Sequence, residues 1–312
     1  MSNSDTELDK GTGRGTQIGT QIRTGGRLRS LSRALRFLPL LFCLTALYLG
    51  VSGSDCDDGP PGEQAWDKIE SFSFSYDVDW TSKGDGLKLS WACPGDVAYC
   101  ERYELSYKDK SGDKMSVIGK NETSVYWPTP CTNMQLRAFY NWNGKKGYVP
   151  SKPVALPTVV TTTLTLYGLS DQTRPNGFAV SSTDWTARGV TYAERAGAAV
   201  WFVVKDVGEE LFLVSPSTIL PEGEWGVREN YSVAVAEDFD DLSHCPGHTE
   251  AIWSLTTELV VGRTYALWHG TFGTWSVTDD FAKVKVLAIN GNEVTLKLAV
   301  SPFPGLRWVI TP

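Results

Sequence analysis

The chain has 312 residues, of which 41% are hydrophobic, and a formal net charge of −7. This apolar fraction suffices for ordinary hydrophobic cores, and the length allows about two domains of roughly 150 residues each. The acidic balance argues against a general nucleic-acid binder, because such proteins need a basic surface to displace the counterions of the phosphate backbone.

The N-terminal region has the charge order of an exported protein. Residues 1–36 are rich in Gly, Thr, Ser and Arg and lack apolar periodicity, which predicts a disordered basic tail. FLPLLFCLTALYLGV follows without a charge, and we predict a signal or membrane anchor over residues 37–53. Because arginines precede it and aspartates follow from Asp55 on, the rest of the chain is expected outside the cytoplasm, membrane-anchored or secreted. Cleavage and retention of the segment both stay open.

Residues 54–70 are predicted to form an acidic linker between the membrane and the folded part. Cys56 lies within it, but Asp55 before it is a poor match to the small residue that lipidation signals require. We therefore expect tethering through residues 37–53 rather than through a lipid.

From residue 71 the apolar residues follow a period of two, as half-buried strands do. These runs cover residues 72–80, 87–91, 103–107, 117–118, 125–127 and 136–140, and a last segment covers 148–157. Short strands with turn signals between them and no helical stretch predict a β-sandwich over residues 71–157.

This part resembles a fibronectin type III domain. LKLSWACP, ERYELSYKDKSG, TSVYWP and MQLRAFYNWNGKKGYVPSKPVAL are similar to its strands B, C, E, F and G. Trp91 matches the core tryptophan of strand B and Tyr103 the aromatic residue of strand C, whereas Met134 stands where the family has its corner tyrosine. The resemblance implies a spacer or binding module without catalysis.

Cys93 and Cys100 flank the predicted loop between strands B and C. Export permits a disulfide, and a bridge over so short a loop would mainly fix the loop's shape. We predict this bridge. Cys131 has Cys56 or Cys245 as alternative partners, and that pairing stays open.

Residues 158–312 predict a second β-rich domain, a β-sandwich or jelly-roll-like fold of unknown function. Its candidate strands cover residues 163–169, 197–205, 210–215, 231–237, 250–261, 264–270, 281–289 and 293–300. Asn290-Gly291 is a strong hairpin signal between the last two. The half resembles only the general type of strand pair in bacterial surface β domains.

SHCPGH places His244, Cys245 and His248 together, and His269 is the remaining histidine. This spacing can bind zinc, so the four residues are candidate metal ligands. The alternative is a solvated turn built by Pro246-Gly247. Cys245 as a nucleophile would need a positioned base that the sequence does not identify, and no cofactor is expected.

The chain contains twelve tryptophans, which either pack in cores and interfaces or stack on sugars. Trp225, Trp268 and Trp275 are the candidates for sugar stacking, because they lie in or beside predicted turns.

We expect an exported, membrane-tethered, non-catalytic protein that acts in adhesion or ligand binding. Its predicted partners are the membrane, an extracellular protein or glycan, and no nucleic acid. The alternative is a carbohydrate-binding protein or an accessory subunit of an extracellular hydrolase.

Overall fold

The computed structural model describes residues 66–82, 84–156, 158–270 and 275–311. Within these ranges the regular structure is antiparallel β-sheet joined by short 3-10 turns, without an α-helix, which confirms the all-β prediction. Among the described residues no helix has the length and apolarity of a membrane span. The predicted tail, the apolar segment 37–53 and most of the linker lie outside these ranges.

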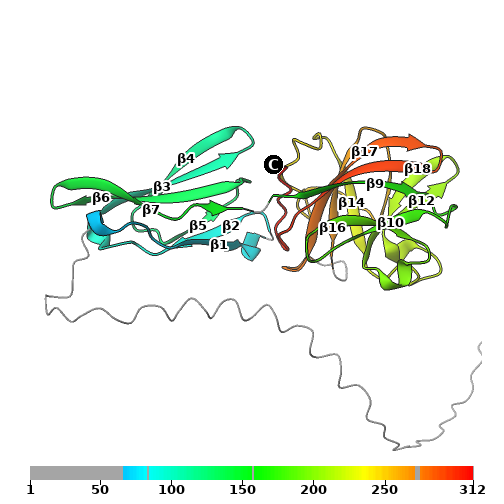
Figure 1. The fold of residues 1–312 in the computed structure, drawn as a ribbon, viewed down its shortest axis with the longest axis horizontal. Helices are drawn as coiled ribbons and strands as arrows, with labels where there is room; N and C mark the ends of the chain where they lie inside the picture. Colours follow the sequence, from blue (N-terminus) through cyan, green and yellow to red (C-terminus); the bar gives the residue numbers. More distant parts are fainter. Residues whose placement is uncertain (1–65, 83, 157, 271–274, 312) are drawn as a thin grey trace, which may run out of the picture. The chain divides into compact units, whose positions relative to one another are not determined.

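The first part of the chain forms two facing sheets of short strands (Figure 1). One sheet has the order β1-β2-β5, and the other has the order β4-β3-β6-β7 with β8 added to β6. The strands are β1 (Phe74–Val78), β2 (Leu87–Trp91), β3 (Cys100–Asp109), β4 (Gly112–Gly119), β5 (Ser124–Trp127), β6 (Asn133–Trp142), β7 (Lys145–Pro150) and β8 (Val154–Ala155).

The period-two pattern of the sequence produces the core between these sheets. Leu87, Leu89 and Trp91 of β2 point inward together, as successive odd positions of a strand must. Tyr103 and Leu105 of β3 meet them from the other sheet, and the Trp91 and Tyr103 rings pack edge to face with centroids 5.3 Å apart. The predicted β-sandwich over residues 71–157 is therefore present.

The loop between β2 and β3 is shaped without the predicted disulfide. Cys93 and Cys100 are both free thiols. A 3-10 turn (Val97–Tyr99) occupies the loop, and the Asp96 carboxylate caps it by accepting from the Ala98 amide at 2.8 Å. Burial, followed by contacts with the two thiols, raises the pKa of the Tyr103 phenol well above its usual value.

Cys131 and Cys245 are also free thiols, buried in separate clusters. Cys245 donates to the backbone oxygen of Ala282 (3.5 Å). Burial raises the pKa of each of these thiols to about 12. The pairing of Cys131 with Cys245 that the sequence left open is thus not formed.

The second part forms two five-stranded antiparallel sheets, with the orders β11-β10-β12-β13-β15 and β14-β16-β17-β18-β9. The strands are β9 (Val160–Tyr167), β10 (Pro175–Val180), β11 (Ala187–Thr191), β12 (Val200–Val207), β13 (Glu210–Val214), β14 (Asn230–Val235), β15 (Thr256–Glu258), β16 (Thr264–His269), β17 (Asp280–Asn290) and β18 (Glu293–Val300).

The outer faces of these sheets are covered as well. One apolar cluster fills the space between the sheets, a second packs on β10, β12 and β13 around Trp225, and a third packs on β14, β16 and β17 around Trp268. All six residues of β16 are buried for this reason. A strand covered on both faces reads as a continuous apolar run, as TYALWH does.

The predicted strands of this half are present, with one reduced to a short segment. Residues 250–261 contribute only β15, because most of this stretch crosses the outer face of the neighbouring sheet as a loop. The strands β10 and β11 were missed. The hairpin at Asn290 is confirmed, with Asn290 paired to Glu293 and Gly291 at φ +61°. Both sandwiches belong to one unit within residues 60–312.

The free thiols give a direct test in a full-length chain whose Cys43 and Cys56 are replaced by serine. Cys93 is half-buried and should react first with a thiol reagent, whereas the buried Cys131 and Cys245 should react only on unfolding. Titration in denaturant should then find four thiols. A titre of two would show that Cys93 and Cys100 form the bridge that the structure lacks.

Candidate ligand site at the sandwich junction

The last described residues connect the two sandwiches by packing into both. After β18 the chain returns toward β2, and Leu306 and Trp308 enter the core of the first sandwich. Val309 packs instead in the cluster on the outer face of β16 and β17. Neighbouring side chains of one extended segment point to opposite sides, so a single segment serves both cores.

Arg307 lies between Leu306 and Trp308 in the chain and is almost fully buried, with 5% of its side chain exposed. Its Nη2 donates to Asp85 Oδ1 at 2.6 Å, and its Nη1 donates to the backbone oxygen of Cys245 at 2.8 Å. Asp85 belongs to the turn between β1 and β2, so this pair joins the first sandwich to the C-terminal segment. The indole of Trp308 adds a bond to the backbone oxygen of Asp85 at 3.1 Å.

The backbone at this contact allows no side chain at residue 84. The Arg307 amide donates to the oxygen of Gly84 at 2.9 Å. A Cβ at Gly84 would lie 1.9 Å from the backbone oxygen of Gly305, and Gly84 has φ +77°. Glycine is therefore required there by both conformation and space.

His244 lies beside the ion pair of Arg307 and Asp85. Its Nε2 lies 3.2 Å from Asp85 Oδ1, and its backbone bridges to Trp308. Burial, followed by repulsion from the Arg307 guanidinium, lowers the pKa of the imidazole to about 4, although Asp85 and Glu250 oppose the shift. The ring is therefore neutral near pH 7.

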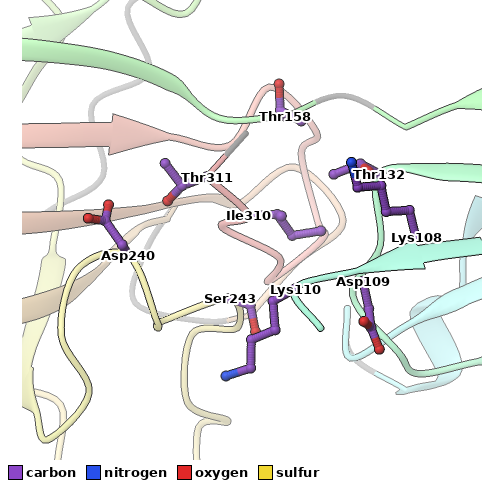
Figure 2. Close-up of a pocket in the computed structure, with 9 residues that line it drawn as sticks. All are labelled: Lys108, Asp109, Lys110, Thr132, Thr158, Asp240, Ser243, Ile310 and Thr311. Carbon is purple, nitrogen blue, oxygen red and sulfur yellow. The ribbon is translucent and has the colours of Figure 1, made fainter. Parts of the chain in front are cut away.

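A pocket of about 670 Å³ lies beside this junction (Figure 2). Its residues come from the β3–β4 hairpin, the β5–β6 loop, the segment before β9, the loop after β14 and the C-terminal segment. They are Lys108, Asp109, Lys110, Thr132, Thr158, Asp240, Ser243, Ile310 and Thr311. All but Ile310 carry a polar side chain.

Both carboxylates of the pocket are already engaged. Asp109 accepts from the amide and hydroxyl of Ser111 at 2.7 and 2.8 Å, and Asp240 pairs with Lys297 at 3.3 Å. Lys108 and Lys110 are exposed and have no carboxylate partner in the described part of the chain. Because Ser111 is neutral, Asp109 keeps its negative charge, and the lining holds two lysine charges against one carboxylate that no ion pair neutralises in the described part of the chain.

The acidic run EDFDD, residues 237–241, lies against lysines of the sheet next to the pocket. Asp238 pairs with Lys285 at 2.5 Å, and the Phe239 ring lies under the ammonium groups of Lys297 and Lys283 at 4.3 and 4.9 Å. Ion pairs and cation–π contacts together hold the loop on the sheet.

Lys283 is fully buried beneath this loop. Its Nζ donates to the backbone oxygen of Leu242 at 2.7 Å and to Thr311 Oγ1 at 2.6 Å. Burial lowers the pKa of Lys283 to about 8, so the ammonium form still predominates at pH 7. In the sequence, Lys283 is one of several lysines that alternate with apolar residues in β17 and β18, and nothing in that pattern marks it as buried.

The four predicted metal ligands are not brought together. His269 stacks on Trp201 at 4.3 Å and accepts from Arg228 at 2.9 Å, Cys245 is buried, and His248 contacts the edge of Trp275. No group of three potential metal-ligating side chains occurs among the residues that the structure describes. The four candidate ligands therefore lie in separate packing environments within the described part of the chain.

Two of the three candidate stacking tryptophans are core residues. Trp225 and Trp268 are each 1% exposed, in different clusters. Trp275 lies 5.1 Å from Trp268 with the rings inclined by 45°, and Trp253 is inclined to Trp275 by 75°. The indoles of Trp253, Trp268 and Trp275 therefore pack against one another and do not form a flat exposed platform.

Comparisons with known proteins add little to this description. No family model matches the sequence, and no curated protein matches it. Among solved structures the chain is similar to a DUF4466 family protein from Parabacteroides merdae, with a TM-score of 0.35 and 10% identity over 74% of this chain and 99% of that one. The fold is therefore defined by the strand orders of the chain's own sheets.

The lowered pKa of His244 gives a pH prediction. An unfolded histidine titrates near 6.5 and the folded His244 at about 4, so the unfolded state binds the proton first as the pH falls. Stability should fall from pH 6.5 to pH 4, by about 2 kcal/mol once partial solvent exposure of the imidazole is allowed for. Urea unfolding of the wild type and His244→Gln at pH 7.0, 5.5 and 4.5 measures this. An equal loss in both proteins would contradict the assignment.

Proposed function

We propose that the chain is an exported, non-catalytic binding protein that holds its ligand in the junction pocket. The observation that carries this proposal is a polar pocket of about 670 Å³ lined by residues from both sandwiches. Cavities of this size accommodate small organic ligands. The ion pair of Arg307 with Asp85 anchors the C-terminal segment, whose Ile310 and Thr311 line the pocket.

The positions of the reactive side chains support a non-catalytic role. Cys245 is buried with a raised thiol pKa, and the pKa of His244 is lowered. His269 lies between Trp201 and Arg228 with its Nδ1 3.2 Å from Asp280. Each of these groups is engaged in packing or hydrogen bonding within the fold and is not directed at a reacting atom.

The strand pairing supports the proposed likeness of the first sandwich to a fibronectin type III module. The segments assigned to strands B and E pair as β2 and β5, and those assigned to C, F and G pair as β3, β6 and β7. This separation into two sheets is that of immunoglobulin-like sandwiches. Such a module would serve as a rigid spacer or binding scaffold.

The proposed export and tethering rest on the order of charges around residues 37–53. A carbohydrate ligand is the second candidate within the same proposal, because four hydroxyl side chains line the pocket. The inclined and mostly buried tryptophans give that candidate less support than the pocket does.

The pocket can be tested by filling it. Ser243→Trp should reduce binding of the full chain to an array of glycans and extracellular-matrix proteins at least tenfold, because the indole occupies the ligand's volume. Ser182→Trp, at an exposed turn outside the pocket, is the matched control and should bind as the wild type does. Equal binding by both variants would contradict the pocket as the site.

Export can be tested by fractionating cells that express the full chain and sequencing the mature N-terminus. We expect either a membrane-bound chain that retains Met1 or a secreted chain that begins near Ser54. Full-length protein recovered only from the cytosol would contradict export.

A further inference from the structure

The chemical class of the ligand follows from which groups of the junction pocket are free to bind it. This inference rests on the proposed function. The Asp109 and Asp240 carboxylates are engaged by Ser111 and Lys297, whereas the ammonium groups of Lys108 and Lys110 have no carboxylate partner in the described ranges. With Asp240 paired to Lys297, a ligand would meet two lysine charges and one carboxylate charge, that of Asp109, so the lining carries an excess of positive charge.

The buried Lys283 adds directed polarity to the wall of the pocket. Its Nζ donates to Thr311 Oγ1 at 2.6 Å, so the Thr311 hydroxyl proton must point away from the ammonium. Since Thr311 lines the pocket, this hydroxyl is available to donate to a ligand. A hydroxyl that already accepts from a cation is a stronger donor, because hydrogen bonds in a chain polarise one another.

No described carboxylate lies within ion-pair distance of Lys283, whose acceptors are neutral oxygens. Other charged or titratable groups facing it are Asp240 and Asp241 on the loop, Cys245, and Lys297 on β18. A buried cation without a contacting anion favours negative charge placed close by, since screening by water is weak there.

We propose that the junction pocket binds a sugar that carries a carboxylate or sulfate group. Lys108 and Lys110 attract the anionic group, and the hydroxyls of the pocket pair with those of the sugar. Thr311 donates to the ligand, and Lys283 acts through Thr311 as a positioning residue. These hydroxyls belong to Thr132, Thr158, Ser243 and Thr311.

The test measures binding to the full chain by titration calorimetry at low salt and pH 7. D-Glucuronate and glucose 6-sulfate are the acidic probes, D-glucose is the neutral control for the ring, and acetate and inorganic sulfate are controls for the anion alone. We expect at least one acidic sugar to bind ten times or more tightly than glucose and than its matching free anion. Ser243→Trp should abolish this binding.

Lys108→Gln and Thr311→Val should each weaken binding of the acidic sugar about fivefold, because the first removes a positive charge and the second removes a hydrogen-bond donor. Lys146→Gln removes an exposed lysine that does not line the pocket and should leave the affinity unchanged. Equal weakening by Lys146→Gln would show a nonspecific charge effect and overturn the inference.

The role of Lys283 has its own readout. Affinity for the acidic sugar should fall between pH 7 and pH 9 as Lys283 loses its proton, and this fall should be smaller in Thr311→Val. This comparison uses no substitution of Lys283 itself, so its outcome does not depend on whether the fold tolerates a change at that buried position. A pH profile that is identical in wild type and Thr311→Val would overturn the positioning role.

The outcomes separate this inference from the function on which it rests. If glucose binds as tightly as the acidic sugars and Ser243→Trp abolishes both, the pocket is the site and the acidic class is wrong. If a free anion binds as tightly as its sugar, the sugar part is wrong. If no probe binds at millimolar concentration, the ligand class is wrong. If binding survives Ser243→Trp, both proposals fail.

Discussion

The buried pair of Arg307 and Asp85 is the interaction on which the arrangement of the junction depends. The guanidinium is 5% exposed, and the chain supplies Asp85 from one sandwich and the Cys245 backbone oxygen from the other as close acceptors for its two Nη atoms. Removing the partly exposed Asp85 would leave the buried Arg307 guanidinium without its close anion, which typically costs up to about 3–5 kcal/mol. The ion pair therefore fixes the position of the C-terminal segment more than it adds to the free energy of folding.

The same segment that carries Arg307 also explains why the junction has both apolar and polar character. Trp308 and Leu306 bury their side chains in the first sandwich, while Thr311 accepts from Lys283 of the second. The apolar contacts provide most of the free energy, since burial scales with area. The hydrogen bonds select one register of the segment, because a slip of one residue would leave the guanidinium without acceptors.

The strands were largely predictable from sequence, and the reason is visible in individual elements. In β2 and β6 the apolar positions of the sequence alternate with polar ones, and the buried positions of the strands follow the same alternation. In β10 the sequence PNGFAV begins with residues typical of turns, and its apolar residues are buried consecutively because both faces of that sheet are covered. Local propensity gave the wrong answer there.

The site could not be predicted in the same way. Asp85 and Arg307 are 222 residues apart, and neither lies in a recognisable motif. The acidic run at residues 237–241 has its lysine partners in strands whose sequence pattern shows only alternation. SHCPGH attracted attention through residue types that usually bind metals, whereas its side chains are fixed by packing and by Asp85. Pairwise chemistry across distant segments needs the fold before it can be read.

The location of the pocket connects ligand binding to the stability of the junction. Its lining includes the β3–β4 hairpin and the β5–β6 loop of the first sandwich, and the segment before β9, the loop after β14 and the C-terminal segment, so a bound ligand would contact both parts of the junction. Any ligand that binds only the assembled junction stabilises it by an amount set by its concentration relative to its Kd. Lys283 also contributes to the stability of the junction, because its ammonium donates to both Thr311 and the Leu242 backbone oxygen and so joins the two segments. Lys108 and Lys110 would attract an anionic ligand, whereas the buried charge of Lys283 keeps the pocket wall in place and polarises the Thr311 hydroxyl that meets the ligand.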